Sequence, residues 1–254
     1  MPHTHTQRRA WRVLLGRAAG IVLVTLVSVP GAAARANHTT IVATDDFSDA
    51  VGTWNGFRVF LSSPRHSFSG ASGRECGWEE NVNGHHWNSW AAKGATNQDN
   101  LRQRGYRVIV SKNARDDGWA LNLQASNNWG ANVHIVTHTN GRAGCPDTPR
   151  AFISMWDVNG DNANSAALSL HLVDKVGAYI PTSDDRWEDC DGDNSGSNDH
   201  GECDANAPHR SYVELFFHDN QPNIDWFQCC GHGGDKVEAA WRYGWAVDAH
   251  LGSP

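Results

Sequence analysis

A series of short apolar runs, each separated from the next by a longer stretch of helical character, constrains this fold more than any other feature of the chain. The runs are rich in Val, Ile and aromatic residues, as buried strands are, and they cover residues 57–61, 106–110, 133–136, 151–156 and 212–217. Helical patterns cover residues 81–104, with a break near Gly94, and residues 119–129, 165–176 and 237–251. Strands that alternate with helices are typical of α/β domains. We therefore expect residues 56–254 to form a single α/β domain with a mostly parallel central sheet flanked by helices.

The first 36 residues have the pattern of a signal peptide. Four arginines precede an apolar run from Ala18 to Val29, which is too short to span a bilayer, and residues 32–36 contain two Ala-x-Ala cleavage sites. An uncleaved membrane anchor is the alternative interpretation. Residues 37–55 are polar and without a clear period, so we expect them to form an N-terminal tail or surface segment of the mature protein. The mature protein is predicted to be secreted, extracellular or periplasmic, with no membrane anchor after processing.

The charge of the mature chain argues against two classes of partner. Residues 1–36 contain five of the 21 Lys and Arg residues and none of the 28 Asp and Glu residues, so their removal changes the net charge from -7 to -12. Nucleic acids and anionic membranes favour basic surfaces. We therefore expect neither to be the main partner of this protein.

Six cysteines follow the predicted signal peptide, and an oxidising destination favours disulfides. Among the possible pairings we favour Cys190 with Cys203, which would close a short polar loop; the other pairings are left open. A cysteine-based zinc site is not favoured, because the sequence has no Cys-x-x-Cys pair.

Residues 184–206 are dominated by Asp, Asn, Gly and Ser, and we expect a solvated acidic surface loop there. Asp189, Asp191 and Asp193 have the alternate spacing of a calcium loop, which is the alternative interpretation. However, Asn194 stands where such a loop needs glycine, and His200 stands where it needs a bidentate glutamate.

Polar residues that follow apolar runs are the first candidates for chemistry, because ligands of open α/β sheets bind beyond the carboxyl ends of the strands. His66 and His138 follow two of the runs, Glu214 interrupts a third, and Glu79 begins the helix after the first strand. Two histidines and one carboxylate are a recurrent ligand set for catalytic zinc. A glutamate held in an apolar strand has a raised pKa and is suited to moving a proton, which makes Glu214 the candidate acid–base residue.

Other interpretations of these residues remain open. In a chain with 14 histidines, a single histidine is more often on the surface or hydrogen-bonded in the core than a metal ligand. Glu79, next to Glu80, also fits a first-turn charge favoured by the helix dipole. The alternative histidine ligands are His85, His86, His134 and His218.

The order of the motifs resembles the zinc-dependent N-acetylmuramoyl-L-alanine amidases, the family of bacterial cell-separation amidases and sporulation lytic enzymes. That family has a histidine after the first strand, a Glu-x-x-x-Asn motif opening the first helix, a Ser-x-His-x-Asn strand end, and a late strand carrying Glu followed by Phe and Asn. This chain has His66, Glu79 to Asn83, Val136 to Asn140 and Glu214 to Asn220 at the corresponding positions. The resemblance covers most of the chain from Phe57 to Leu251.

The resemblance implies a set of roles. His66, Glu79 and His138 would bind Zn²⁺, and Glu214 would be the catalytic carboxylate. The Glu-x-x-x-Asn spacing selects Glu79 over Glu80, since only Glu79 has an asparagine four residues later. The substrate would be peptidoglycan, cleaved at the amide bond between N-acetylmuramic acid and the L-alanine of the stem peptide.

The sequence also departs from the family pattern. Arg65-His66-Ser67-Phe68 replaces the family's Gly-His-Gly-Gly, and Phe216 replaces a small residue. We therefore expect a differently shaped substrate groove. Two other functions remain as alternatives: a zinc peptidase with another scissile bond, and an inactive protein that binds wall glycans through some of its 12 tryptophans.

Overall fold

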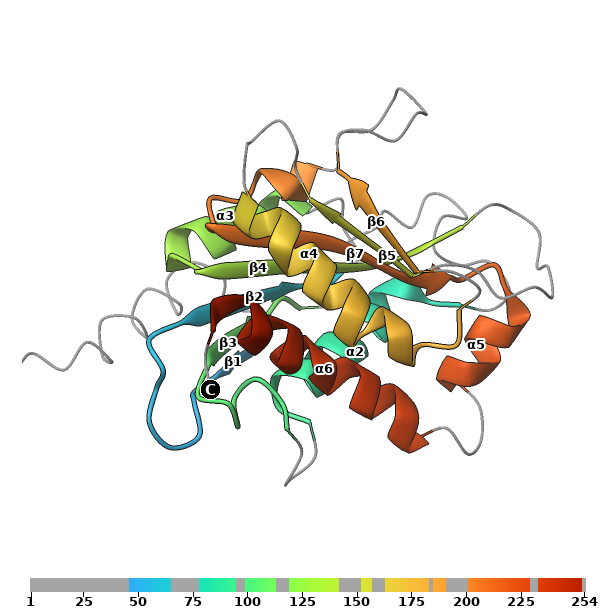
Figure 1. Ribbon diagram of the computed structural model, residues 1–254, viewed down its shortest axis with the longest axis horizontal. Helices are drawn as coiled ribbons and strands as arrows, with labels where there is room; N and C mark the ends of the chain where they lie inside the picture. The colour runs from blue at the N-terminus through green and yellow to red at the C-terminus, as the bar shows by residue number, and fades with distance from the viewer. Residues whose placement is uncertain are drawn as a thin grey trace, which may run out of the picture.

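The structure is a computed structural model that describes residues 46–64, 78–94, 99–112, 119–141, 152–156, 163–182, 185–190, 201–228 and 233–252 (Figure 1). A seven-stranded sheet with the order β1-β3-β2-β4-β7-β5-β6 lies at its centre. The strands are β1 (Asp46–Ser48), β2 (Arg58–Ser62), β3 (Arg107–Val110), β4 (Val133–Asn140), β5 (Phe152–Trp156), β6 (Asp185–Asp189) and β7 (His209–Phe217). The predicted signal peptide, His66 and four cysteines, Cys76, Cys145, Cys229 and Cys230, lie outside the described residues.

The sheet is mostly parallel, which confirms the predicted fold class. β3, β2, β4 and β7 pair in parallel in that order, and β5 pairs in parallel with β6. Two pairings are antiparallel, β1 with β3 and β5 with β7. The parallel core therefore brings the carboxyl ends of β2, β3, β4 and β7 to one edge.

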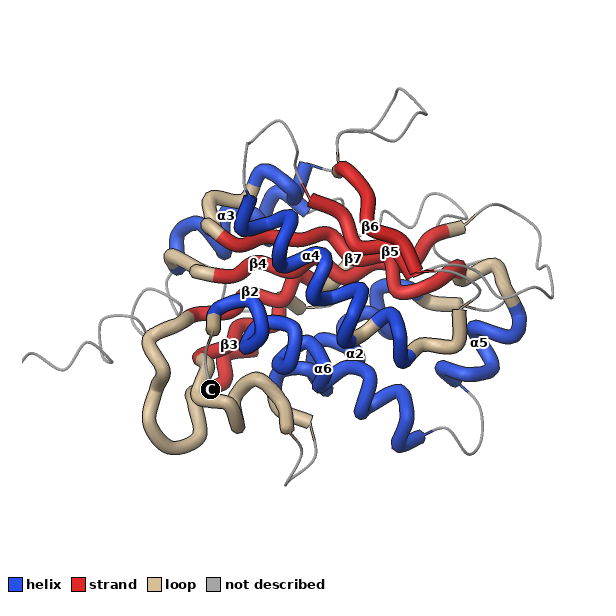
Figure 2. The backbone as a smooth tube through the Cα atoms, viewed as in Figure 1, coloured by secondary structure: helices blue, strands red, loops and turns tan. Residues whose placement is uncertain are grey.

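Helices cover both faces of the sheet. α2 (Glu80–Ala92), α4 (Ala163–Lys175) and α6 (Gly233–Leu251) lie on one face, and α3 (Trp119–Trp129) lies on the other (Figures 1 and 2). A further helix, α5 (Gln221–Gln228), follows β7. This arrangement is a three-layer α/β/α sandwich.

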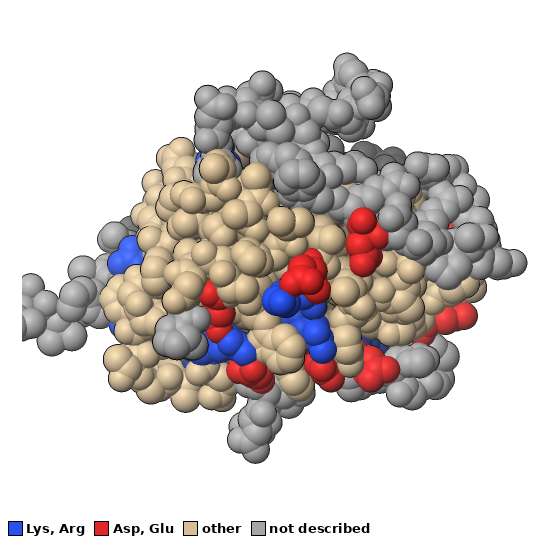
Figure 3. All heavy atoms as spheres, in the orientation of Figure 1, with Lys and Arg blue, Asp and Glu red and all other residues tan. Residues whose placement is uncertain are grey.

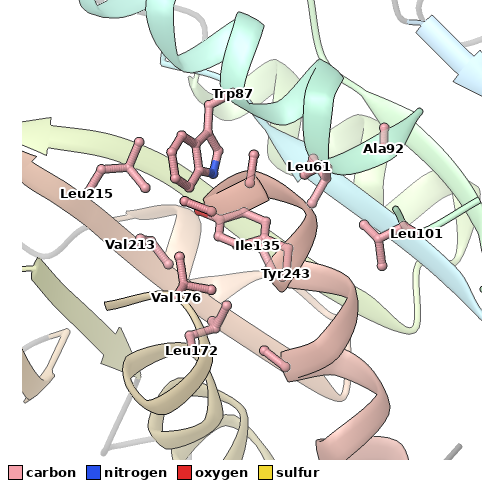
Figure 4. Close-up of a cluster of buried hydrophobic side chains, with 14 of the residues drawn as sticks. Leu61, Trp87, Ala92, Leu101, Ile135, Leu172, Val176, Val213, Leu215 and Tyr243 are labelled. Carbon is pink, nitrogen blue, oxygen red and sulfur yellow. The ribbon is translucent and has the colours of Figure 1, made fainter. Parts of the chain in front are cut away.

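Side-chain alternation along the strands divides the core between the two faces. Val59 and Leu61 of β2 join the main core beneath α2, α4 and α6, whereas Phe60 between them packs with Ala125 and Trp129 of α3. Figure 4 shows the main core, where Trp87 of α2 and Tyr243 of α6 lie over Ile135, Val213 and Leu215 of the sheet. Burial on both faces explains why these strands are continuous apolar runs in the sequence.

The structure contains four elements that were not expected from the sequence. The segment 184–206 was predicted to be a surface loop throughout, but Asp185–Asp189 forms edge strand β6, and Gly201–Asp204 forms a short 3-10 helix. Residues 46–48, expected in a polar tail, form β1, and helix α5 was not predicted. β1 and β6 are the two edge strands of the sheet, and their sequences, Asp-Phe-Ser and Asp-Arg-Trp-Glu-Asp, contain no apolar run.

The predicted pairing of Cys190 with Cys203 is confirmed. Within the described part of the chain, no helix combines the length and the apolar character required to cross a membrane. On the face that carries α4 and α6, Lys and Arg side chains are interspersed with Asp and Glu, with no basic patch among the described residues (Figure 3). This face therefore has the mixed charge that the composition indicates.

A histidine cluster near the start of β7 makes the stability of the fold depend on pH. His250 Nε2 lies 2.7 Å from His209 Nδ1, and the ring of His171 lies 6.1 Å from that of His250. Burial, and then the neighbouring His209 and His171, lower the pKa of His250 from 6.5 to about 4. Between these values the unfolded chain binds a proton that the folded chain excludes, so stability falls as the pH falls from about 6.5 to about 4.

We expect His250→Gln to reduce this loss of stability, because the replacement does not titrate. Free energies of unfolding from urea titrations at several pH values between 7 and 4 test this expectation. His86→Gln is the control, since the His86 side chain is exposed. An equal dependence on pH in the wild type and in His250→Gln would contradict the assignment.

Candidate active site

The winding of the chain reverses between β2 and β4. From β2 the chain passes through α2 to β3 and then returns through α3 to β4 on the other side of β2. Right-handed crossovers in opposite directions place α2 and α3 on opposite faces. In open α/β sheets, ligands bind at such a switch point, beyond the carboxyl ends of the strands.

His138 and Glu214 face each other at this edge. They are direct partners in the register between β4 and β7, and regular pairing shifts immediately after His138. Both side chains are nearly buried, with exposed fractions of 8% and 7%. The structure thus brings together two of the four site residues predicted from the sequence.

Helix α2 adds a second carboxylate at the same position. Glu80 is its first residue, is 2% exposed, and places Oε1 3.3 Å from His138 Nδ1. The backbone N–H and the hydroxyl of Thr139 both donate hydrogen bonds to this oxygen. Trp78 Nε1 in turn donates to the Thr139 hydroxyl at 3.0 Å, so the carboxylate is held in one position.

The carboxylate beside His138 is therefore Glu80 and not Glu79, whose side chain is exposed. The physical reason is the helical period. The buried side of α2 also carries Gly84, Trp87 and Ala91, and residues four, seven and eleven positions after Glu80 share its face. This spacing is present in the sequence, whereas the Glu-x-x-x-Asn motif points to Glu79.

Glu214 is a buried carboxylate with a raised pKa. Burial, and then the charge of Glu80, raise its pKa well above the usual value of 4.5. Within the described residues its Oε2 has no hydrogen-bond partner. A buried carboxylate oxygen without a partner is costly in a folded protein, and it indicates a group that serves a ligand.

Two donor atoms of the site are spaced as two ligands of one metal ion are. Two ligands of a tetrahedral zinc lie about 3.4 Å apart when the bonds are about 2.1 Å long. The spacing of Glu80 Oε1 and His138 Nδ1 is close to this, 3.3 Å. In the described part of the chain no group of three or more His, Cys, Asp or Glu residues is arranged to hold a metal. The third ligand expected from the sequence, His66, lies outside that part, and its role stays a prediction.

The four alternative histidines have other surroundings. His85 Nδ1 lies 3.1 Å from the carbonyl oxygen of Ser111, and His86 is exposed. His134 is fully buried, with Nδ1 2.8 Å from Ser126 Oγ. His218 Nδ1 lies 3.0 Å from the Thr139 hydroxyl, which connects it to Glu80. None of the four faces Glu214 across a strand pair, as His138 does.

Two buried residues near the site were not predicted. Tyr212 stacks on His138, with ring centroids 5.0 Å apart. Glu202, next to Cys203, is 3% exposed and accepts a hydrogen bond from Ser62 Oγ at the end of β2. In the sequence, the indication for Glu202 is its position next to Cys203, because the expected Cys190–Cys203 disulfide would fix that segment.

No family model matches the sequence, and no curated protein matches it. Solved structures do match the fold. The catalytic domain of the N-acetylmuramoyl-L-alanine amidase CwlV from Bacillus (Paenibacillus) polymyxa var. colistinus aligns with a TM-score of 0.59 at 13% identity, over 78% of this chain and 99% of that one.

Two further amidases give similar alignments. An N-acetylmuramoyl-L-alanine amidase from Clostridium difficile 630 has a TM-score of 0.59 at 14% identity, over 81% of this chain and 99% of its own. Ami1 from Mycobacterium smegmatis has a TM-score of 0.58 at 13% identity, over 80% and 100%. The structural neighbours are thus N-acetylmuramoyl-L-alanine amidases, and the fold expected from the resemblance is confirmed.

Gly84 allows α2 to approach the sheet closely enough for Glu80 to reach His138. A Cβ atom at position 84 would lie 2.5 Å and 2.7 Å from two ring carbons of Pro64. Gly84→Ala is therefore expected to destabilise the protein by about 1–3 kcal/mol. This is opposite in sign to the gain of about 1 kcal/mol that alanine normally gives in a helix.

Urea unfolding of Gly84→Ala, with Ser89→Ala on the same helix as the control, measures this effect. A stabilised Gly84→Ala variant would show that the space between α2 and Pro64 accommodates a methyl group.

Proposed function

We propose that this chain is a zinc-dependent N-acetylmuramoyl-L-alanine amidase. It hydrolyses the amide bond between the lactyl group of N-acetylmuramic acid and the L-alanine of the peptidoglycan stem peptide. The observation that carries the proposal is the convergence of Glu80, His138 and Glu214 at the carboxyl ends of β4 and β7. The shared fold with amidases supports it.

In this proposal Glu80 and His138 hold the zinc, and His66 supplies the third ligand. Glu80 takes the role that the motif spacing assigned to Glu79, because Glu80 is the buried carboxylate next to His138. When bound, zinc lowers the pKa of water and polarises the scissile carbonyl. Thr139 donates two hydrogen bonds to Glu80 Oε1, which fix the position of the carboxylate.

Glu214 is the acid–base residue. Its buried carboxylate is a stronger base than a solvated one, because burial raises its pKa. It takes a proton from the attacking water and returns it to the departing amine nitrogen of L-alanine. The position opposite His138 brings this carboxylate next to the proposed metal site.

We also propose that the mature protein acts outside the cytoplasm, on the cell wall. The arginine-rich, apolar N-terminus has the pattern of a signal peptide, and the Cys190–Cys203 bridge suits an oxidising compartment.

Replacing Glu214 tests the chemistry. Glu214→Gln is expected to lower turnover by about 10²- to 10⁴-fold with zinc content unchanged, because the amide keeps the shape but cannot accept the proton. Mass spectrometry of digested peptidoglycan measures the products, which for an amidase are intact stem peptides beginning with free L-alanine. Glu238→Gln is the control, a carboxylate on α6 that pairs with Arg242.

Each result has a distinct meaning. Wild-type activity in Glu214→Gln would remove the proposed role of Glu214. Fragments cut within the stem peptide would identify a peptidase instead of an amidase. A zinc-loaded wild-type chain that binds the wall but releases nothing would identify an inactive binding protein.

Metal binding tests the ligand set. The mature chain is expected to hold about one zinc, and chelation is expected to abolish hydrolysis until zinc is restored. Glu80→Gln and His138→Gln should weaken binding by more than the roughly 10- to 100-fold that follows loss of a supporting residue. Glu79→Gln is the matched control and should bind as the wild type does. Metal analysis and zinc titration decide the outcome: loss of zinc in Glu79→Gln, with retention in Glu80→Gln, would reverse the assignment.

A further inference from the structure

Tyr212 occupies a position from which it can orient His138. It lies two residues before Glu214 on β7, and its register partner is Val136, two residues before His138 on β4. Alternation along the strands therefore puts Tyr212, Glu214 and His138 on the same face of the sheet. The rings of Tyr212 and His138 are stacked, with 5.0 Å between centroids and 25° between planes.

The ring of Tyr212 is itself enclosed. It is 7% exposed and belongs to a buried cluster with Val136, Ile153, Phe217 and the two bridged cysteines, Cys190 and Cys203. Such a ring has little freedom to move, because neighbouring side chains occupy the space around it. It presents a fixed flat surface to the imidazole of His138.

The disulfide ties the cluster to the rest of the site. Cys190 follows β6, whereas Cys203 lies in the 3-10 helix 201–204. In that helix Glu202 accepts a hydrogen bond from Ser62 Oγ, and its Oε2 lies 3.5 Å from His134 Nε2. The bridge thus joins the edge strand to a segment anchored at the carboxyl end of β2.

We propose that Tyr212 is a positioning residue whose ring holds the imidazole of His138 in its ligand orientation, and that the Cys190–Cys203 disulfide keeps Tyr212 in place. The effect of Tyr212 on zinc affinity rests on the proposed function, whereas its effect on the orientation of the His138 ring does not. Residues that orient a metal ligand typically change metal affinity or activity by about 10- to 100-fold when removed. The ring, and not the hydroxyl group, carries this effect.

Two substitutions separate the ring from the hydroxyl. Tyr212→Phe keeps the ring and is expected to bind zinc within a few-fold of the wild type, whereas Tyr212→Leu should bind roughly 10- to 100-fold more weakly. Zinc affinity is measured by competition with a chromophoric chelator. Tyr106→Leu is the matched control, a fully buried tyrosine hydrogen-bonded to Asp248, and should lower stability but leave zinc affinity unchanged.

A metal-free measurement keeps this test separate from the test of the proposed function. Long-range ¹H–¹⁵N spectra of the apo protein report the state of the His138 ring, identified by its loss in His138→Gln. Tyr212→Phe should keep the sharp signals of the wild type at the same chemical shifts, whereas Tyr212→Leu should show shifted, broadened or multiple signals. If the wild type binds no zinc, the proposed function fails, but these spectra still decide the role of Tyr212.

The disulfide has its own test. A water-soluble phosphine reduces the bridge by taking oxygen from water, and the two protons of that water go to the two sulfurs. Reduction should weaken zinc binding in the wild type but have no further effect on a Cys190→Ser/Cys203→Ser variant, which should already bind weakly. Wild-type affinity in Tyr212→Leu, or an equal loss in Tyr212→Phe, overturns the role of the ring. Unchanged affinity in the double-serine variant overturns the role of the bridge.

Discussion

The register between β4 and β7 is the constraint on which the candidate site depends. Parallel strands lie about 4.8 Å apart, so direct partners on one face are forced into proximity. Here the partners are His138 and Glu214, and the carboxylate lies within the apolar run of residues 212–217 of β7. Burial of a carboxylate costs several kcal/mol unless a partner compensates it, so this register is stable only in a protein that provides compensation. A bound cation would provide it.

The close contact of α2 with the sheet brings a second buried carboxylate to the same site. Gly84 lets the helix lie against Pro64, and Asn88 donates hydrogen bonds to Ser62 and Ser63. The first residue of the helix, Glu80, then enters the site, and its charge adds to burial in raising the pKa of Glu214. Two carboxylates buried beside one imidazole are costly to ionise together in a region of low dielectric constant, and a divalent cation bound there would offset that cost.

Much of the fold was predictable from the sequence, but edge strand β6 was not. The apolar runs that became β2, β3, β4, β5 and β7 are buried in the sheet and carry a strong side-chain pattern. β6 pairs with β5 in the structure, although its sequence was read as part of a loop. For the site, strand ends identified His138 and Glu214, whereas the choice between Glu79 and Glu80 depended on which side of α2 faces the sheet.

The sequence by itself determined the alternating α/β pattern, the candidate histidine and glutamate at two strand ends, and the pairing favoured for Cys190 and Cys203. These features depend on local periodicity and on residues adjacent in the chain. Only the tertiary structure decided that Glu80 contacts His138, that Tyr212 stacks on the same imidazole, and that Glu202 is buried against Ser62. These contacts join residues that are between 58 and 140 positions apart in the chain, and they follow from strand register and helix rotation, which short stretches of sequence do not specify.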